Sequence, residues 1–223
     1  MTTEPAPDPE ARGVRLVPVL LGLTVVSGLI DAVSFLGLGH VFTANMTGNV
    51  VMLGFAAAGA PGFTVRHTAL SLACFLVGAV AGGRVVRRVG GSRRTGARVT
   101  LAAEAVLLAG AAAVAYATPT RIYAVIALTA FAMGLRNATV RKLSVRDLTT
   151  TTVVTMTLTG LASDSHAGGG TGRGTPRRAA AVIAMFAGAA LGAWLVIHHD
   201  VALPLLVAAA TSGVLALTAS GRD

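Results

Sequence analysis

The chain has 223 residues, of which 54% are apolar and 12% charged, and its mean hydropathy is +0.74. This composition excludes an ordinary soluble globular domain and predicts an all-α integral membrane protein. The single cysteine excludes an internal disulfide and a thiolate metal cluster. A net charge of +9 would suggest nucleic acid as the partner of a soluble protein. Here the charges lie where membrane topology explains them, so we expect the lipid bilayer, and no nucleic acid, as a partner.

The chain begins with a polar segment and continues as long apolar blocks. We predict that residues 1–14 form a disordered tail. They carry acidic residues and prolines where a signal peptide would carry basic residues, so we do not expect a signal peptide here. Six blocks are each long enough to cross about 30 Å of hydrocarbon as a helix. Two of them, which contain Arg84 and Arg136, fit only if these side chains extend to the lipid headgroups. The predicted spans are Leu16–Leu38, Thr68–Val86, Val99–Thr118, Ile122–Val140, Ala179–Ile197 and Val201–Ser220.

Two polar stretches lie between these blocks, at matching places in the two halves of the chain. They are Val41–Gly54 and Asp147–Gly160. A constant offset of 106 residues relates them, and the same offset pairs Gly28 with Gly134 and Asp31 with Asn137. We therefore expect one membrane domain built from two repeats, residues 15–118 and 119–220, with a short tail at 221–223. Paired, polar, glycine-interrupted segments of this kind indicate a substrate site.

The distribution of basic residues predicts how the chain crosses the membrane, since positive charge collects in cytoplasmic loops. If both polar stretches are re-entrant and the N-terminus is inside, 16 of the 18 Lys and Arg residues lie inside. If only the first stretch crosses, the best count is 14 against 4, and if both cross it is 10 against 8. The preferred arrangement places both termini in the cytoplasm and gives the repeats inverted topology. Its inner residues are Arg12, Arg15, Arg84, Arg87, Arg88, Arg93, Arg94, Arg98, Arg136, Arg141, Lys142, Arg146, Arg173, Arg177, Arg178 and Arg222.

The polar stretches supply side chains that suit a solute or ion path. Irregular backbone at membrane depth survives only when it is buried in protein or lines a wet cavity. The alternative is that these hydroxyls bond back to carbonyls of their own helix and only pack helices together. The predicted lining residues are Asp31, Asn45, Thr47 and Asn49 in the first half, and Asn137, Thr150, Thr151 and Thr155 in the second.

Two acids lie inside predicted spans, and each has two interpretations. Asp31 is either a proton- or cation-coupling carboxylate or a structural group that caps the broken segment or pairs with an arginine. Glu104 is either a second relay acid or the partner of an arginine, and we favour the arginine pair. Small residues recur four apart at Gly78 and Gly82, and at Gly188 and Gly192, which predicts close helix packing.

No pattern indicates a catalytic site, a cofactor or a metal. His198, His199 and Asp200 stand together in a predicted turn between helices, where adjacent histidines are usually interfacial. The glycine-rich run 168–174 lacks the residues of a phosphate-binding loop and reads as a linker. We therefore expect no enzyme activity, no cofactor and no metal.

Two strings carry a family resemblance. The segment GLIDAVSFLGLGHVFTANMTGNVVMLG at 28–54, and GLRNATVRKLSVRDLTTTTVVTMTLTG at 134–160, resemble the signatures of the YoaK-type family of small bacterial membrane proteins of unknown function. The resemblance spans residues 15–220. It implies an integral protein of the bacterial inner membrane with about six spans, and it assigns no substrate, cofactor or catalytic residue.

Three functions remain open from the sequence. The first is a secondary transporter or channel for a small solute or ion. The second is a non-transporting scaffold or assembly partner, and the third is an intramembrane enzyme that acts on lipid. A homo-oligomer is compatible with each of them.

Overall fold

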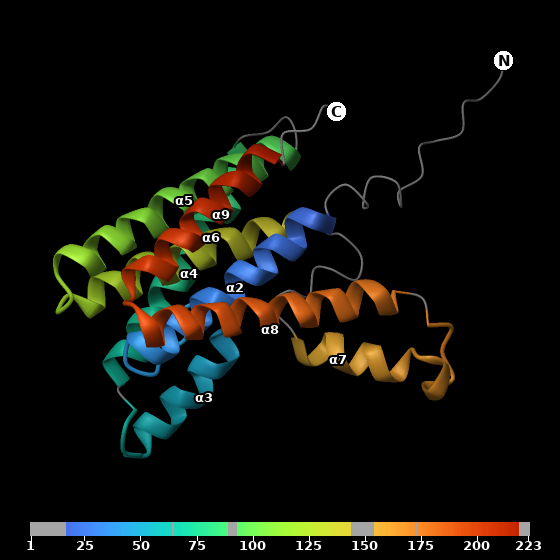
Figure 1. Ribbon diagram of the computed structural model, residues 1–223, viewed down its shortest axis with the longest axis horizontal. Helices are drawn as coiled ribbons and strands as arrows, with labels where there is room; N and C mark the ends of the chain where they lie inside the picture. Colours follow the sequence, from blue (N-terminus) through green and yellow to red (C-terminus); the bar gives the residue numbers. More distant parts are fainter. Residues whose placement is uncertain (1–16, 64, 89–92, 144–153, 173, 219–223) are drawn as a thin grey trace.

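The computed structural model describes residues 17–63, 65–88, 93–143, 154–172 and 174–218, and within these ranges all of the regular secondary structure is helical (Figure 1). The long helices form where uninterrupted apolar blocks allow every backbone group to be satisfied within the helix. The α-helices are α2 (Val17–Gly37), α3 (Met46–Ala57), α4 (Val65–Arg88), α5 (Arg93–Ala117), α6 (Ile122–Leu143), α7 (Val154–Ser163), α8 (Thr175–His198) and α9 (Ala202–Thr218), with a short 3-10 helix, η1, at His166–Gly168.

The helices fall into two length classes. Five of them, α2, α4, α5, α6 and α8, are long and apolar enough to cross a membrane. The sixth predicted span became α9, whose 17 described residues rise about 25 Å. The first polar stretch contributes to the short helix α3, with 12 residues, and the described part of the second, from Val154, contributes to α7, with 10. Neither short helix is long enough to cross the bilayer alone.

Helices of one half of the chain pack mainly against helices of the other half. The most extensive pairs are α2 with α8, α4 with α6, and α5 with α9. Helix α5 also packs on α6, and α2 packs on α9. The short helices lie at the edge of this bundle farthest from α5 and α9, where α3 contacts α4 and α7 contacts α8 (Figure 1).

Two apolar clusters show in which direction the long helices run. The smaller cluster joins Leu20 of α2, Leu101 of α5 and Ala181 of α8, near the starts of these helices, to Val140 and Ala216, near the ends of α6 and α9. Helices α2, α5 and α8 therefore run one way, and α6 and α9 run the other. The spacing of contacts makes α4 parallel to α6, because the backbone at Gly78 lies against Phe131 and the backbone four residues later, at Gly82, lies against Leu135.

A tight turn after α2 brings the first polar stretch back against that helix. Gly39 and His40 both have positive φ, of 84° and 57°. A side chain at residue 39 would also meet the ring of His67 on α4, so this position requires glycine for space as well as for conformation. The turn places residues 41–45 beside α2, ahead of the start of α3.

Candidate functional site

The carboxylate of Asp31 receives the backbone at the break between α2 and α3. Asp31 lies on α2 and is only 6% exposed. Its Oδ1 accepts hydrogen bonds from the backbone N–H groups of Ala44, at 3.1 Å, and Asn45, at 3.2 Å. These donors belong to non-helical backbone and would otherwise be unsatisfied within the bundle. The sequence predicted side chains as the donors nearest Asp31, whereas the structure supplies main-chain amides.

Asn49 holds the same loop from the other side. Its Oδ1 accepts from the backbone N–H of Phe42 at 2.9 Å, and its Nδ2 donates to the carbonyl of Phe42 at 2.6 Å. The same Nδ2 donates to the hydroxyl of Ser71 on α4 at 3.2 Å, and Ser71 in turn donates to the Phe42 carbonyl at 2.7 Å. Asn49 is fully buried, so this cluster fixes α3 and its preceding loop to α4.

The remaining polar residues of the first stretch have different environments. Asn45 is the N-cap of α3 and accepts a hydrogen bond from the N–H of Gly48 at 3.2 Å. Thr47 is exposed on α3. Thr43 is completely buried, and its Oγ1 has no hydrogen-bond partner. The structure therefore brings Asp31, Asn45 and Asn49 to one loop and leaves Thr47 outside it.

The second half has a neutral residue at the position that corresponds to Asp31. Asn137 of α6 is partly buried, and its Nδ2 is a buried donor without a partner. Of the other predicted lining residues, Thr150 and Thr151 lie outside the described part of the chain. Thr155, on α7, is exposed. The two predicted half-sites therefore differ in charge.

A cleft of about 340 Å³ lies where α7 meets α8. Arg178 of α8 crosses it and donates from Nη1 to Oδ2 of Asp164 at 2.7 Å and to the carbonyl of Gly160 at 2.9 Å. The hydrogen bond from Arg178, with a smaller contribution from Ser163, lowers the pKa of the Asp164 carboxyl. The lining residues are Met156, Thr157, Thr159, Gly160, Ser163, Asp164 and Arg178.

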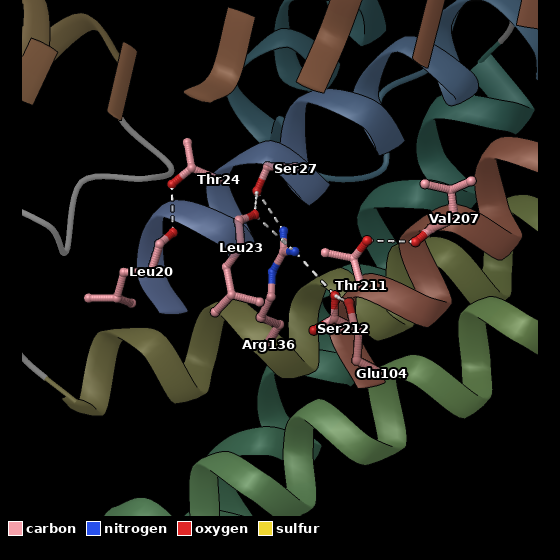
Figure 2. Close-up of polar contacts among 9 residues, drawn as sticks. All are labelled: Leu20, Leu23, Thr24, Ser27, Glu104, Arg136, Val207, Thr211 and Ser212. Atoms are coloured by element: carbon pink, nitrogen blue, oxygen red, sulfur yellow. Dashed lines mark hydrogen bonds and ion pairs between the residues drawn. The ribbon is translucent and has the colours of Figure 1, made fainter. Parts of the chain in front are cut away.

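A second polar cluster occupies the centre of the bundle. Arg136 of α6 is 2% exposed, and its Nη1 forms an ion pair with Oε1 of Glu104 on α5 at 3.1 Å. Its Nη2 donates to Ser27 of α2 at 2.7 Å, and Ser212 of α9 donates to the same Glu104 oxygen at 3.0 Å. Figure 2 shows the guanidinium lying between α2 on one side and Glu104 with Ser212 on the other.

This cluster corrects one prediction and decides between two others. The expectation that Arg136 reaches the lipid headgroups is wrong, because the side chain points into the bundle and its charge is paired there. Of the two interpretations of Glu104, the arginine pair is the one in the structure, although the partner comes from within a span and not from the basic loops. Sequence spacing gave no sign of this pair, since 32 residues separate its members and its geometry depends on how α5 packs on α6.

Most other buried hydroxyls near the centre bond within their own helix. Thr24 donates to the carbonyl of Leu20 at 2.8 Å, and Thr129 donates to that of Val125 at 2.7 Å. Thr139 does the same with Leu135 at 3.0 Å. These contacts match the packing interpretation of intramembrane hydroxyls. Among the described residues, the buried side-chain atoms without a hydrogen-bond partner are Thr43 Oγ1, His67 Nδ1, Glu104 Oε2, Asn137 Nδ2 and Thr175 Oγ1.

The four glycines predicted to pack helices all lie against backbone of the opposite half. A Cβ at Gly78 would stand 2.1 Å from the carbonyl oxygen of Phe131, and one at Gly188 would stand 2.0 Å from that of Val25. The corresponding distances are 2.5 Å for Gly82 and 2.7 Å for Gly192. Any side chain there would force the two backbones apart.

Comparison with known families identifies the chain's relatives. A family model described as "Protein of unknown function (DUF1275)" matches residues 19–218. The chain belongs to the DUF1275 family. A relative, the UPF0700 transmembrane protein YoaK of Bacillus subtilis (strain 168), is 33% identical over 144 residues. The match covers 64% of this chain and 64% of that relative, so it spans less than two thirds of either.

These matches confirm the resemblance seen in the sequence. The DUF1275 match includes both polar stretches and all of the described helices except the first two residues of α2. No solved structure matches the chain significantly. The family assignment therefore agrees with a helical membrane protein but carries no chemistry, and the functional argument rests on the arrangement of the side chains and helices described above.

Proposed function

We propose that this protein is a secondary transporter or channel for a small solute or ion, located in the bacterial inner membrane. The observation that carries the proposal is that helices of one half pack mainly against helices of the other half, and that the two halves run in opposite directions. Each half also includes one short helix, α3 or α7. Transporters built from inverted repeats place their substrate sites at such interrupted helices.

The glycine contacts support the repeat because they are repeated themselves. Gly78 lies against Phe131 in the α4–α6 pair, and Gly188 lies against Val25 in the α2–α8 pair. The glycines are 110 residues apart and their partners are 106 residues apart. The contacts of Gly134 with Phe75 and of Gly28 with Met185 show the same two offsets. Here the glycines are 106 residues apart and their partners are 110 residues apart. The pattern is the one expected if a pseudo-twofold axis relates the halves.

The directions of the helices support inverted topology. We assign three crossing helices to each half, α2, α4 and α5 in the first and α6, α8 and the shorter α9 in the second. An odd number of crossings reverses the second half, in agreement with the opposite directions of α2 and α6. In this arrangement α9 is the sixth span, and α3 and α7 are re-entrant.

The charges at the helix ends support cytoplasmic termini. Arg87 and Arg88 end α4. Arg177 and Arg178 begin α8, which starts at the same end of the bundle. Arg66, in the first turn of α4, and Arg121, directly before α6, lie at the opposite end of the bundle. The excess of positive charge at one end follows the rule for cytoplasmic loops.

The scaffold remains the chief rival, because much of the polar centre is satisfied by protein groups alone. A scaffold does not need two re-entrant helices related by inversion, however, nor a buried carboxylate at the first break. A buried carboxylate without a counter-charge is costly, and an ionisable residue within a membrane span points to function.

Reconstitution separates transport from scaffolding. The full chain is incorporated into proteoliposomes, and uptake is measured with a voltage-sensitive dye under gradients of Na⁺, K⁺ and Cl⁻, and with a panel of labelled small solutes. Asp31→Asn keeps the shape of the side chain and is expected to abolish the flux. Thr129→Val is the matched control, since its hydroxyl bonds only its own helix, and it should transport normally. Flux no greater than that of empty liposomes across the whole panel would favour the scaffold.

A further inference from the structure

The buried charges of the described helices do not balance. Three ionisable side chains are buried there, namely Asp31, Glu104 and Arg136. Two are acids and one is a base. Arg136 is committed to Glu104 and to Ser27. When both acids are ionised, Asp31 therefore carries one negative charge that no basic side chain contacts among the residues that the structure describes.

The two backbone amides that donate to Asp31 do not supply the positive charge that would balance its carboxylate. Both donate to Oδ1, and among the described residues no donor reaches the other oxygen, Oδ2. Backbone amides contribute partial charges only, whereas an isolated carboxylate inside a membrane protein needs a full counter-charge or a proton.

The residue that precedes these amides carries a hydroxyl oxygen without a hydrogen-bond partner. Thr43 immediately precedes Ala44, whose N–H donates to Asp31, and its hydroxyl is completely buried without a partner. Buried hydroxyls are normally hydrogen-bonded, so an unpaired hydroxyl on the residue before the amides that hold an uncompensated carboxylate points to a ligand. A proton on Asp31 would also neutralise the charge, and the pH dependence of stability distinguishes it from a cation.

We propose that Asp31 and Thr43 bind one monovalent cation of about the size of Na⁺. Carboxylate and hydroxyl oxygens are ligands that hard cations prefer. The single excess negative charge is matched by one positive charge, whereas Mg²⁺ or Ca²⁺ would leave the buried site with a net charge of the opposite sign. The non-helical backbone at residues 41–45 has carbonyl oxygens that are not used within a helix and could serve as further ligands.

The second half lacks this site. Asn137 replaces the carboxylate with a neutral amide at the position related to Asp31. One cation is therefore bound per chain. As a coupling ion the cation rests on the proposed transport function, but its binding does not, and the two are measured separately.

The test uses the full chain purified in detergent. Binding of ²²Na⁺ is measured by scintillation proximity, and thermal unfolding is followed in NaCl, LiCl, KCl and choline chloride at equal ionic strength. The wild type should bind one Na⁺ per chain and should unfold at a higher temperature in NaCl than in choline chloride, because a ligand bound only by the folded state stabilises it. Asp31→Asn should abolish both effects.

Variants at Thr43 keep the test decisive if Asp31→Asn does not fold. Thr43→Val is isosteric and removes the hydroxyl, and it should weaken Na⁺ binding by about tenfold or more, as the loss of a supporting ligand does elsewhere. Thr43→Ser retains the oxygen and should bind nearly as the wild type does. Thr129→Val removes a buried hydroxyl that bonds its own helix and should leave Na⁺ binding unchanged.

Each other outcome has a defined meaning. Equal unfolding temperatures in all four salts, without saturable ²²Na⁺ binding, would overturn the cation site, and pH-dependent stability in that case would assign a proton to Asp31. Unaltered binding by Thr43→Val would also overturn the assignment. Saturable binding without flux in proteoliposomes would leave the site intact and refute transport. Flux without Na⁺ binding would support transport and overturn the cation site.

Discussion

Arg136 of α6 and Glu104 of α5 form a buried ion pair with 3.1 Å between Nη1 and Oε1, and each residue comes from a different half of the chain. Ser27 of α2 and Ser212 of α9 complete the cluster. One guanidinium and one carboxylate thereby connect four long helices.

Breaking this pair on one side should be more damaging than removing it. Arg136→Met or Glu104→Leu alone leaves an uncompensated buried charge, and each should lower the free energy of unfolding by about 3–5 kcal/mol. The double variant Arg136→Met, Glu104→Leu removes both charges and should recover much of that loss. Thermal unfolding in detergent, arranged as a double-mutant cycle, measures the coupling. Additive effects of the two changes would show that the pair does not act as a unit.

The glycine contacts predict that alanine lowers stability at glycines packed on opposing backbone and is tolerated at glycines in open positions. Gly78→Ala and Gly188→Ala each place a Cβ within about 2 Å of a carbonyl oxygen of the opposite half. They should destabilise the protein by about 2 kcal/mol or more, since overpacking costs of this order are usual. Gly83→Ala and Gly110→Ala are the controls, because a Cβ at either position meets nothing within 4 Å. The controls should be neutral or slightly stabilising, as alanine favours helix over glycine.

The loop cluster in the first half gives a matched pair of changes on α3. Asn49→Ala removes hydrogen bonds to both backbone groups of Phe42 and to Ser71, and it leaves the Phe42 N–H without its acceptor, whereas the Phe42 carbonyl keeps the hydroxyl of Ser71. The expected cost is about 2 kcal/mol or more. Thr47→Ala, on the exposed side of the same helix, should change stability by less than about 0.5 kcal/mol. Equal effects of the two changes would contradict this account of the loop.

The proposed topology predicts on which side two connections lie. In a Cys74→Ser background, Thr171→Cys, between α7 and α8, should react with a membrane-impermeant maleimide only from the cytoplasm. Thr118→Cys, after α5, should react only from outside. Both positions are exposed and uncharged, so the changes do not alter the distribution of positive charge. Labelling of both from the same side would rule out the inverted repeat.

The contact between Asp164 and Arg178 should weaken in acid. The pKa of Asp164 is lowered from its ordinary 3.8 in the folded protein, so the pair stabilises the α7–α8 arrangement above that pH. This contribution is lost as the pH falls through the lowered folded-state pKa, below 3.8. Spin labels at the exposed positions 158 and 183 should report a broader distance distribution there. Asp164→Asn should show the broader distribution at neutral pH, with no further change in acid.

Much of the secondary structure was predictable because its signal is local. The block Leu16–Leu38 became α2 at Val17–Gly37, and the polar stretches became short helices, since glycine and β-branched residues interrupt long apolar runs. The candidate site was predicted less well. Asp31, Asn45 and Asn49 were identified as polar residues of one region, but the main-chain donors to Asp31 and the orphan hydroxyl of Thr43 depend on the turn at Gly39 and His40.

The sequence by itself determined the class of protein, the places of the helices and their breaks, and the uneven distribution of charge, because hydropathy and helix propensity act over neighbouring residues. Only the tertiary structure decided that α2 pairs with α8 and α4 with α6, and that Arg136 turns inward to Glu104 and not outward to the headgroups. An arginine near a helix end satisfies its charge equally well in either direction until a carboxylate on another helix is brought within reach. That choice depends on the packing of α5 on α6, which brings Glu104 within reach of Arg136.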